Sequence, residues 1–432
     1  MDWTDDGGAS AALYARAREV MPGGSTRAAV WLEPYPPYIA RGEGAYVYDV
    51  DGTDYLDLTN NLGVLIHGHA HPEVVAAVRE QAGLGSCFAL PTPAEVELAE
   101  LLCGRVAGFD QLRFINTGSE AVGLALKIAR SFTGRSKIVK LEGVYHGSND
   151  FAEISNYSKP ENWGNTPASV PVVRGTPPGV LDAVLAIAAN DIAGAETVLR
   201  AHSAEIAAVL IDPVPPRAGM QPLEPDFVSA LRALTRELGI LLIYDEVIAF
   251  RFAYGGAQTR FGGEPDLTAL GKIIGGGYPV GAVAGRRDIM EATASDVGSS
   301  GTFTANPVTM RAGLASMQLL PPERFDELDA QGARMREGVN ELFREAGISG
   351  QACGTGSIFS IYFHDRAVHD YRSYFKTPEE TAFSSAFHRE MLRRGVLIAP
   401  TATCFFSTAV TAADEDRFLS TCRASLSNLG AG

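Results

Sequence analysis

The chain has 432 residues, of which 46% are hydrophobic and 20% are charged, a composition typical of a folded globular protein. Its length exceeds that of one compact core, so two or three lobes are expected. The formal net charge of −15 argues against nucleic acid or an anionic membrane as a partner. Any anionic ligand must therefore be held by groups placed locally.

Cysteine usage and the absence of long apolar runs predict a cytoplasmic protein. The 5 cysteines are widely scattered and lack CxxC spacing, which favours a reducing compartment over a disulfide framework. The first residues, MDWTDDGGAS, are acidic where a signal peptide would be basic. No apolar run reaches the roughly 18–20 residues that a membrane-spanning helix needs.

The chain begins with a predicted helix over residues 11–20 and a predicted β-hairpin around Asp51-Gly52. From about residue 90, helical stretches alternate with short apolar runs. This alternation predicts an α/β fold with a mainly parallel central sheet and helices on both faces. The apolar runs are 112–115, 137–140, 206–211 and 240–244.

A smaller α+β lobe is expected from the two ends of the chain. A helix over 309–319 leads into a C-terminal section whose last helix starts at Ala413. The predicted organisation is an N-terminal segment 1–65 that joins the small domain, a large domain 66–310 and a C-terminal small domain 311–432. In such sheets, ligands bind at the carboxyl ends of the strands.

The first segment with chemical potential is Phe114-Ile-Asn-Thr117-Gly118-Ser119-Glu120. A strand runs into Thr-Gly-Ser, and a helix opens directly after it. The free N–H groups and positive dipole end of a helix start form an anion site, to which the two hydroxyls add donors. Thr117 with Glu120 also fits a capping box, so simple N-capping remains an alternative.

The second segment, Ile240-Leu-Leu-Ile-Tyr-Asp245-Glu246-Val247, delivers two carboxylates at the end of a buried strand. A buried unpaired carboxylate is costly, so one of them should meet a cation or a protonated heterocycle. A metal or a helix cap would also satisfy this pattern.

The third segment places Lys272 inside an apolar stretch that is followed by Gly275-Gly276-Gly277. Burial lowers the pKa of a lysine and makes it nucleophilic, and the glycines allow the backbone to approach a bulky group. The alternative is a surface lysine beside a flexible loop. Together, a phosphate-binding helix start, a strand-end carboxylate and a desolvated lysine are the groups that bind pyridoxal 5′-phosphate (PLP).

These segments resemble class III PLP-dependent aminotransferases, in the branch of glutamate-1-semialdehyde 2,1-aminomutase and β-phenylalanine aminotransferase. Matching stretches run from Met21-Pro-Gly-Gly to Thr411-Ala-Ala-Asp-Glu-Asp, with the spacing of Asp245 and Lys272 the most specific feature. The resemblance implies the fold type I, aspartate-aminotransferase-like architecture. It also implies a homodimer with shared active sites.

The resemblance also implies roles for individual residues. Lys272 would be the Schiff-base lysine and general acid/base, and Asp245 would pair with the pyridinium nitrogen. The remaining cofactor contacts would come from Tyr145 and Val247 on the two ring faces, His146 beside Tyr145, Thr117, Gly118 and Ser119 at the phosphate, and Gly301 and Thr302 toward the partner's phosphate.

The alternating histidines His67, His69 and His71 have a spacing that could suggest a metal site. They coincide with the family's Gly-His-x-His-Pro stretch, where no metal is implied, and we expect none here. A metal-dependent hydrolase is therefore only a remote alternative.

The substrate is expected to carry a carboxylate, because Arg27 matches an arginine that holds one in both relatives and its planar fork suits that role. A surface salt bridge is the alternative for Arg27. Arg217 is either a substrate anion contact or a loop residue, in a segment that reads Asp212-Pro213 where relatives have Glu-Pro. Phe405 and Phe406 either line a substrate pocket or fill the small-domain core.

The predicted activity is ping-pong transamination between a carboxylate-bearing amino acid, β-amino or aromatic acids included, and an oxo acid. The alternatives within PLP chemistry are an aminomutase and an amino-acid racemase. Residues 400–407 lack the carboxylate of the mutases and carry Thr401 where the β-phenylalanine enzymes have an arginine. The mutase reaction is accordingly disfavoured.

Overall fold

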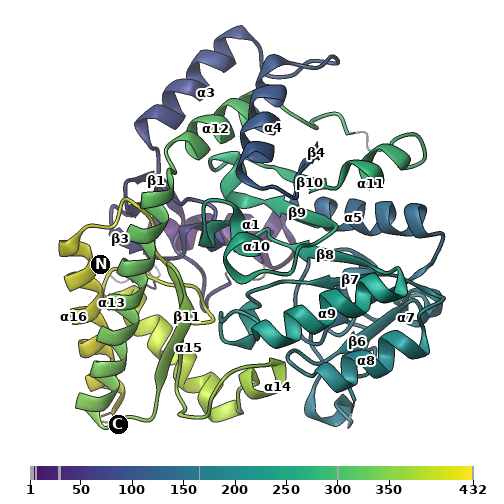
Figure 1. The fold of residues 1–432 in the computed structure, drawn as a ribbon. Helices are drawn as coiled ribbons and strands as arrows, with labels where there is room; N and C mark the ends of the chain where they lie inside the picture. The colour runs from purple at the N-terminus through teal and green to yellow at the C-terminus, as the bar shows by residue number, and fades with distance from the viewer. Residues whose placement is uncertain (1–3, 5–6, 28–30, 165, 299–300, 431–432) are drawn as a thin grey trace. The chain divides into compact units, whose positions relative to one another are not determined.

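The computed structural model describes residues 4, 7–27, 31–164, 166–298 and 301–430 (Figure 1). The chain forms two compact units. The smaller unit comprises residues 1–72, 326–366 and 376–432, and the larger unit comprises residues 73–325 and 367–375. The domain boundaries expected from the sequence, at residues 65/66 and 310/311, remain predictions.

The larger unit is built on a seven-stranded sheet with the order β4-β10-β9-β8-β7-β5-β6 (Figure 1). Strand β10 pairs antiparallel with both neighbours, and the other pairs are parallel. This confirms the predicted mainly parallel sheet. The strands are β4 (Gln111–Ile115), β5 (Lys137–Leu141), β6 (Val184–Ile187), β7 (Ile206–Ile211), β8 (Leu241–Asp245), β9 (Leu267–Gly271) and β10 (Gly281–Gly285).

Side chains of alternate residues divide the sheet between two apolar clusters. On β8, for example, Leu241 and Ile243 join the cluster around α5, whereas Leu242 and Tyr244 join the cluster around α8 and α9. Both faces of the sheet are therefore covered, as parallel sheets require. The helices of this unit include α4 (Pro93–Arg105), α5 (Gly118–Thr133), α6 (Asp150–Glu153), α7 (Pro178–Asp182), α8 (Ile192–Ala201), α9 (Pro225–Leu238), α10 (Gly256–Phe261), α11 (Arg287–Ala292), α12 (Pro307–Gln318) and α14 (Tyr371–Tyr374).

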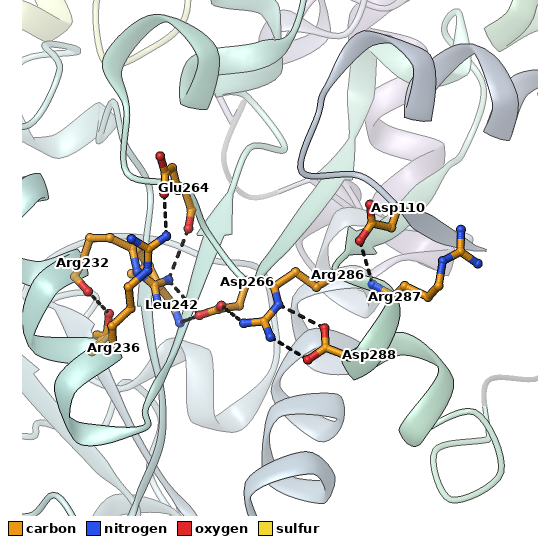
Figure 2. Close-up of polar contacts among 10 residues, drawn as sticks. Asp110, Arg232, Arg236, Leu242, Glu264, Asp266, Arg286, Arg287 and Asp288 are labelled. Atoms are coloured by element: carbon orange, nitrogen blue, oxygen red, sulfur yellow. Dashed lines mark hydrogen bonds and ion pairs between the residues drawn. The ribbon is translucent and has the colours of Figure 1, made fainter.

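At the amino ends of β8 and β9 and the carboxyl end of the antiparallel β10, the buried carboxylate of Asp266 joins three donors (Figure 2). Its Oδ2 accepts hydrogen bonds from Arg232 Nη1 and from the Leu242 amide, and its Oδ1 accepts one from Arg286 Nη1, all at 2.8 Å. Arg286 also pairs with the exposed Asp288. The network ties helix α9 and three neighbouring strands together at the edge of the sheet opposite Lys272.

The smaller unit contains a four-stranded sheet, β1-β2-β3-β13, and a three-stranded sheet, β11-β12-β14. Strands β2 and β3 form the predicted hairpin, with Val47 opposite Tyr55. The strands are β1 (Ile39–Glu43), β2 (Tyr46–Asp49), β3 (Asp54–Asp57), β11 (Gln351–Thr355), β12 (Ile358–Tyr362), β13 (Val396–Leu397) and β14 (Thr403–Phe405). The helices of this unit include α1 (Ala9–Val20), α2 (Asn60–Gly63), α15 (Pro378–Arg393) and α16 (Ala412–Gly430). Two helices cross the boundaries between the units, α3 (Pro72–Leu84) and α13 (Pro322–Ala346).

Phe405 and Phe406 are buried in this unit, at 3% and 0% exposure. The Phe406 ring stacks on Phe359 with 5.6 Å between centroids and meets Phe418 edge-on. Of the two interpretations left open by the sequence, the structure therefore supports the small-domain core. Within the described part of the chain, no helix combines the length and apolar character needed to cross a membrane.

Candidate active site

The segments singled out from the sequence follow strands that run in the same direction. Thr117 follows β4, Tyr145 follows β5, Asp212 follows β7, Asp245 ends β8 and Lys272 follows β9. Because these strands are parallel, their carboxyl ends lie at one edge of the sheet. The fold thus brings the predicted residues of the larger unit to a common edge.

The segments of Gly118, Val247 and Gly271 approach one another so closely that an added Cβ at either glycine would meet its neighbours. A Cβ added to Gly118, at the start of α5, would lie 2.8 Å from Val247 Cγ1. One added to Gly271, at the end of β9, would lie 3.3 Å from the same methyl group and 3.5 Å from the Gly118 Cα. The helix start, the carboxylate strand and the lysine strand therefore meet at this point.

The start of α5 is a capping box, as predicted. Thr117 Oγ1 accepts a hydrogen bond from the Glu120 amide at 3.1 Å, and Glu120 Oε2 accepts from the Thr117 amide at 3.0 Å. The amides of Gly118 and Ser119, in the first turn, have no carbonyl partner within the helix. Thr117 therefore caps the helix, and the first-turn amides provide the anion-binding potential.

Asp245 and Glu246 have different surroundings. Glu246 Oε1 and Oε2 accept hydrogen bonds from the amides of Gln258 and Ala257 at 3.0 and 2.6 Å. Burial raises the pKa of Glu246 to about 7. Glu246 thus serves as the cap of the α10 backbone, which leaves Asp245 as the carboxylate available for a cationic group.

Asp245 is oriented by His146. His146 Nδ1 lies 2.8 Å from Asp245 Oδ2, and the Val247 amide donates to Asp245 Oδ1 at 3.0 Å. Burial lowers the pKa of His146, and the neighbouring Asp245 partly opposes this shift. The contact therefore suits a His146 that donates its Nδ1 proton to the Asp245 carboxyl group.

Lys272 lies directly after β9 with a left-handed backbone, φ 48°. This conformation is unfavourable for a lysine and persists where the surroundings enforce it, often at functional sites. Burial and the charge of Asp245 raise the pKa of Asp212 well above its usual value, and the positive charge of Lys272 opposes that rise. Lys272 and Asp245 therefore both lie close enough to Asp212 to influence its ionisation.

Two further loops reach the same region. Gly147, with φ 92°, approaches Ser119 so closely that an added Cβ would lie 2.6 Å from the Ser119 Cα. Tyr145 is 51% exposed. Gly301 lies beside the end of β4, where an added Cβ would be 3.1 Å from Asn116 Nδ2, and the adjacent Thr302 is exposed.

The loop that carries Tyr145 and His146 is anchored by two cations. The fully buried Lys140 donates from Nζ to Val144 O, Ile154 O and Asn156 Oδ1, each at 2.8 Å. Arg217 Nη1 donates to Gly143 O at 3.3 Å and to Asn156 O. These contacts give Arg217 a loop-anchoring role, and a contact between Arg217 and substrate remains a prediction.

Sequence reasoning missed Lys140. The available signal was a lysine inside the apolar run 137–141. A charged side chain on a strand of a sheet that is covered on both faces must reach specific hydrogen-bond acceptors. The acceptors come from residues 144–156, whose return toward β5 is a property of the tertiary fold.

Arg27 belongs to the smaller unit, where its Nη1 donates to Asn61 Oδ1 at 2.7 Å. Both side chains line a cavity of about 300 Å³ together with His69, Asp57 and apolar residues such as Leu32 and Leu397. Among the described residues, the Arg27 guanidinium pairs with the neutral side-chain amide of Asn61 and with no carboxylate. Its charge is therefore available at this cavity.

Two of the three alternating histidines have separate polar partners, and the ring of the third, His71, lies 5.4 Å from that of His67. His69 Nε2 lies 2.7 Å from Asp57 Oδ2, and His67 Nδ1 lies 3.1 Å from Thr408 Oγ1. Among the residues the structure describes, no group of three or more His, Cys, Asp or Glu side chains is arranged to hold a metal ion.

The donor set at the strand ends fits PLP. The first-turn amides of α5 and the Ser119 hydroxyl suit a phosphate, Asp245 suits a protonated pyridine nitrogen, and Lys272 suits the aldehyde carbon. His146 Nε2 is buried without a hydrogen-bond partner in the described chain, as expected beside a site that a polar group completes. The glycines described above leave the space that a side chain would fill.

Known proteins share the sequence pattern and the fold of this chain. Residues 28–421 match the family model described as aminotransferase class-III. A glutamate-1-semialdehyde 2,1-aminomutase from Desulforudis audaxviator is 40% identical over 422 residues, which cover 96% of each chain.

Two solved structures are similar over nearly the whole chain. An omega-transaminase from Sphaerobacter thermophilus has a TM-score of 0.96 and 46% identity, covering 100% of this chain and 99% of its own. A β-phenylalanine aminotransferase from Variovorax paradoxus has a TM-score of 0.88 and 32% identity, covering 98% and 94%. The chain is a PLP-dependent enzyme and belongs to the class III aminotransferase family.

Proposed function

We propose that this enzyme transfers an amino group from a carboxylate-bearing amino acid to an oxo acid by a ping-pong mechanism. The observation that carries the proposal is the meeting of Lys272, Asp245 and the start of α5 at the carboxyl ends of β9, β8 and β4. Bound PLP supplies an electron sink that stabilises the substrate carbanion.

The chain's own residues divide the remaining work. Lys272 Nζ would hold the cofactor and would take the proton from the amine-bearing carbon of the substrate. Asp245 keeps the proton on the pyridine nitrogen, and His146 orients Asp245 through the 2.8 Å contact. Ser119 and the first-turn amides hold the phosphate, while Tyr145, Val247 and Gly301 complete the proposed cofactor contacts.

Arg27 supports the choice of substrate. Its guanidinium lies at a cavity with apolar walls and has a neutral amide, Asn61, as its hydrogen-bond partner. A carboxylate attached to an apolar body, as in aromatic and β-amino acids, matches a cation beside apolar walls. The name of the Variovorax paradoxus relative, a β-phenylalanine aminotransferase, agrees with that class.

An aminomutase reaction is the second candidate, because the Desulforudis audaxviator relative is named glutamate-1-semialdehyde 2,1-aminomutase. Residues 400–407 carry no carboxylate and bury Phe405 and Phe406, which favours transamination. A racemase would use the same lysine without an external acceptor.

The proposal places the protein in the cytoplasm. It also includes a homodimer, in which Thr302 contacts the phosphate of the cofactor that the partner subunit binds. Exposed apolar side chains of the larger unit support it. Leu84, Leu90 and Phe303 are 72%, 78% and 64% exposed, and Phe303 adjoins Thr302. The segment of Leu84 and Leu90 contacts that of Phe303, because Cys87 Sγ donates to Thr302 O at 3.6 Å, and clustered exposed apolar residues typically mark protein interfaces.

The test is a panel of α- and β-amino acids added to the PLP-loaded enzyme without an acceptor. The proposal predicts one equivalent of oxo acid per active site and conversion of the cofactor to its amine form. Arg27→Ala should raise KM for carboxylate donors, whereas Arg41→Ala, at an exposed arginine paired with Glu43, should not. Amino transfer within one substrate, with no oxo acid released, would establish the mutase instead.

A further inference from the structure

Four consecutive residues of the smaller unit have left-handed backbones. The φ angles of Asn60, Asn61, Leu62 and Gly63 are 46°, 50°, 59° and 86°. Three of these residues carry a side chain, and successive left-handed residues other than glycine are unfavourable. We refer to residues 60–63 as the left-handed turn.

Buried polar groups hold the left-handed turn in place. Asp57, which is 4% exposed, accepts hydrogen bonds at Oδ1 from the amides of Thr59 and Asn60, at 2.8 and 3.0 Å. Its other oxygen lies 2.7 Å from His69 Nε2. Asn60 Nδ2 donates to the carbonyl of Phe405. These contacts fix the backbone and the side chain of the first residue of the turn.

The left-handed turn presents one side chain to Arg27. Asn61 Oδ1 accepts a hydrogen bond from Arg27 Nη1 at 2.7 Å, and both residues line the cavity of about 300 Å³. Asparagine suits this position for two reasons. It tolerates a left-handed backbone better than most residues, and its amide oxygen accepts a hydrogen bond without neutralising the guanidinium.

We propose that Asn61 is a positioning residue that sets the preference for carboxylate-bearing substrates by fixing Arg27 while leaving its charge uncompensated. Among the described residues, Asn61 accepts from one N–H of the Arg27 guanidinium, and the planar fork suits a substrate carboxylate at its remaining N–H groups. Apolar walls at Leu32, Val47 and Leu397 accept the substrate's apolar body. The inference rests on the proposed role of Arg27.

The test uses Asn61→Asp, which keeps the size of the side chain and adds a negative charge beside Arg27. The fixed carboxylate competes with that of the substrate, so KM for amino-acid donors should rise about tenfold or more while kcat changes little. KM for a primary amine donor without a carboxylate should stay the same or fall. Asn61→Gly, which relieves the strain and removes the acceptor, should give a smaller rise in KM.

Asn190→Asp is the matched control, since Asn190 is also left-handed, with φ 62°, but lies in the larger unit. It should leave KM unchanged for both donor classes. In an Arg27→Ala background, Asn61→Asp should have no further effect on KM, because the two residues act as one unit.

The outcomes separate this inference from the proposed function. If the wild-type enzyme releases no oxo acid from any donor, the proposed function is wrong. If it transaminates normally but Asn61→Asp leaves KM for carboxylate donors unchanged, only the role of Asn61 is refuted. Equal losses with amine and amino-acid donors would indicate a structural defect and would also overturn the inference.

Discussion

Replacing Asp266 by alanine should destabilise the larger unit far more than removing its exposed neighbour Asp288. Asp266 is 3% exposed and receives hydrogen bonds from Arg232, Leu242 and Arg286 (Figure 2). Alanine would leave the buried Leu242 amide without its acceptor. It would also leave the Arg232 guanidinium, 9% exposed, with no carboxylate.

The magnitude follows from which contacts are buried. Hydrogen bonds to a charged group contribute about 1.5–3 kcal/mol each, and leaving a buried charge unpaired costs about 3–5 kcal/mol. The contact with Arg286 adds little, because that side chain is 47% exposed and keeps Asp288 as a partner. We expect Asp266→Ala to lower the free energy of unfolding by about 3–5 kcal/mol, and Asp288→Ala by about 0–1 kcal/mol.

The assay is denaturant unfolding of the PLP-loaded enzyme, followed by circular dichroism, with both variants and the wild type compared. Because Lys272 lies at the opposite ends of these strands, Asp266→Ala should still bind PLP when folded at low temperature. Similar unfolding midpoints for Asp266→Ala and Asp288→Ala would refute the reasoning.

Three further results are expected. Asp245→Asn should lower kcat/KM about 100-fold or more at saturating PLP, because an amide does not hold the proton on the pyridine nitrogen. Near-normal steady-state activity of this variant would count against the proposed role of Asp245. Gly118→Ala places a methyl group 2.8 Å from Val247 Cγ1 and should weaken PLP binding in a fluorescence titration, whereas Gly104→Ala, with no atom within 4 Å, should leave it unchanged. Burial lowers the pKa of His388 to about 4, so the unfolded chain takes up this proton first. Stability should therefore fall as the pH drops from about 6.5 to about 4, and less steeply in His388→Gln; identical pH profiles would contradict this.

Much of the sheet edge that carries the candidate active site was predictable, because its residues lie where local sequence patterns end. The apolar runs 112–115, 137–140, 206–211 and 240–244 became β4, β5, β7 and β8 with ends within one residue. Lys272 and Asp245 could be proposed from the sequence because a charge that ends an apolar run has few structural explanations.

The strands β9 and β10 were harder to predict because they are rich in small residues, LTALG and GAVAG. Their small side chains reflect close packing against other elements. A Cβ on Gly285, for example, would lie 2.6 Å from the Asp266 carbonyl oxygen. Such contacts are set by the tertiary fold and leave no periodic pattern in the sequence.

Tertiary contacts also decided the questions that the sequence left open. Asp245 and Glu246 are equivalent as adjacent strand-end carboxylates, and only the position of the α10 amides assigns the cap to Glu246. The contact between Asn61 and Arg27 likewise depends on a left-handed turn, which asparagine permits but does not predict.

The central claim is that Lys272 carries the cofactor. The direct measurement is borohydride reduction of the PLP-loaded enzyme, followed by protease digestion and mass spectrometry of the lysine-containing peptides. The account predicts a phosphopyridoxyl group on the peptide that contains Lys272, and no such group in Lys272→Ala treated in the same way. Labelling of a different lysine, such as the buried Lys140, or the absence of any labelled peptide from yellow, PLP-loaded protein, would contradict it.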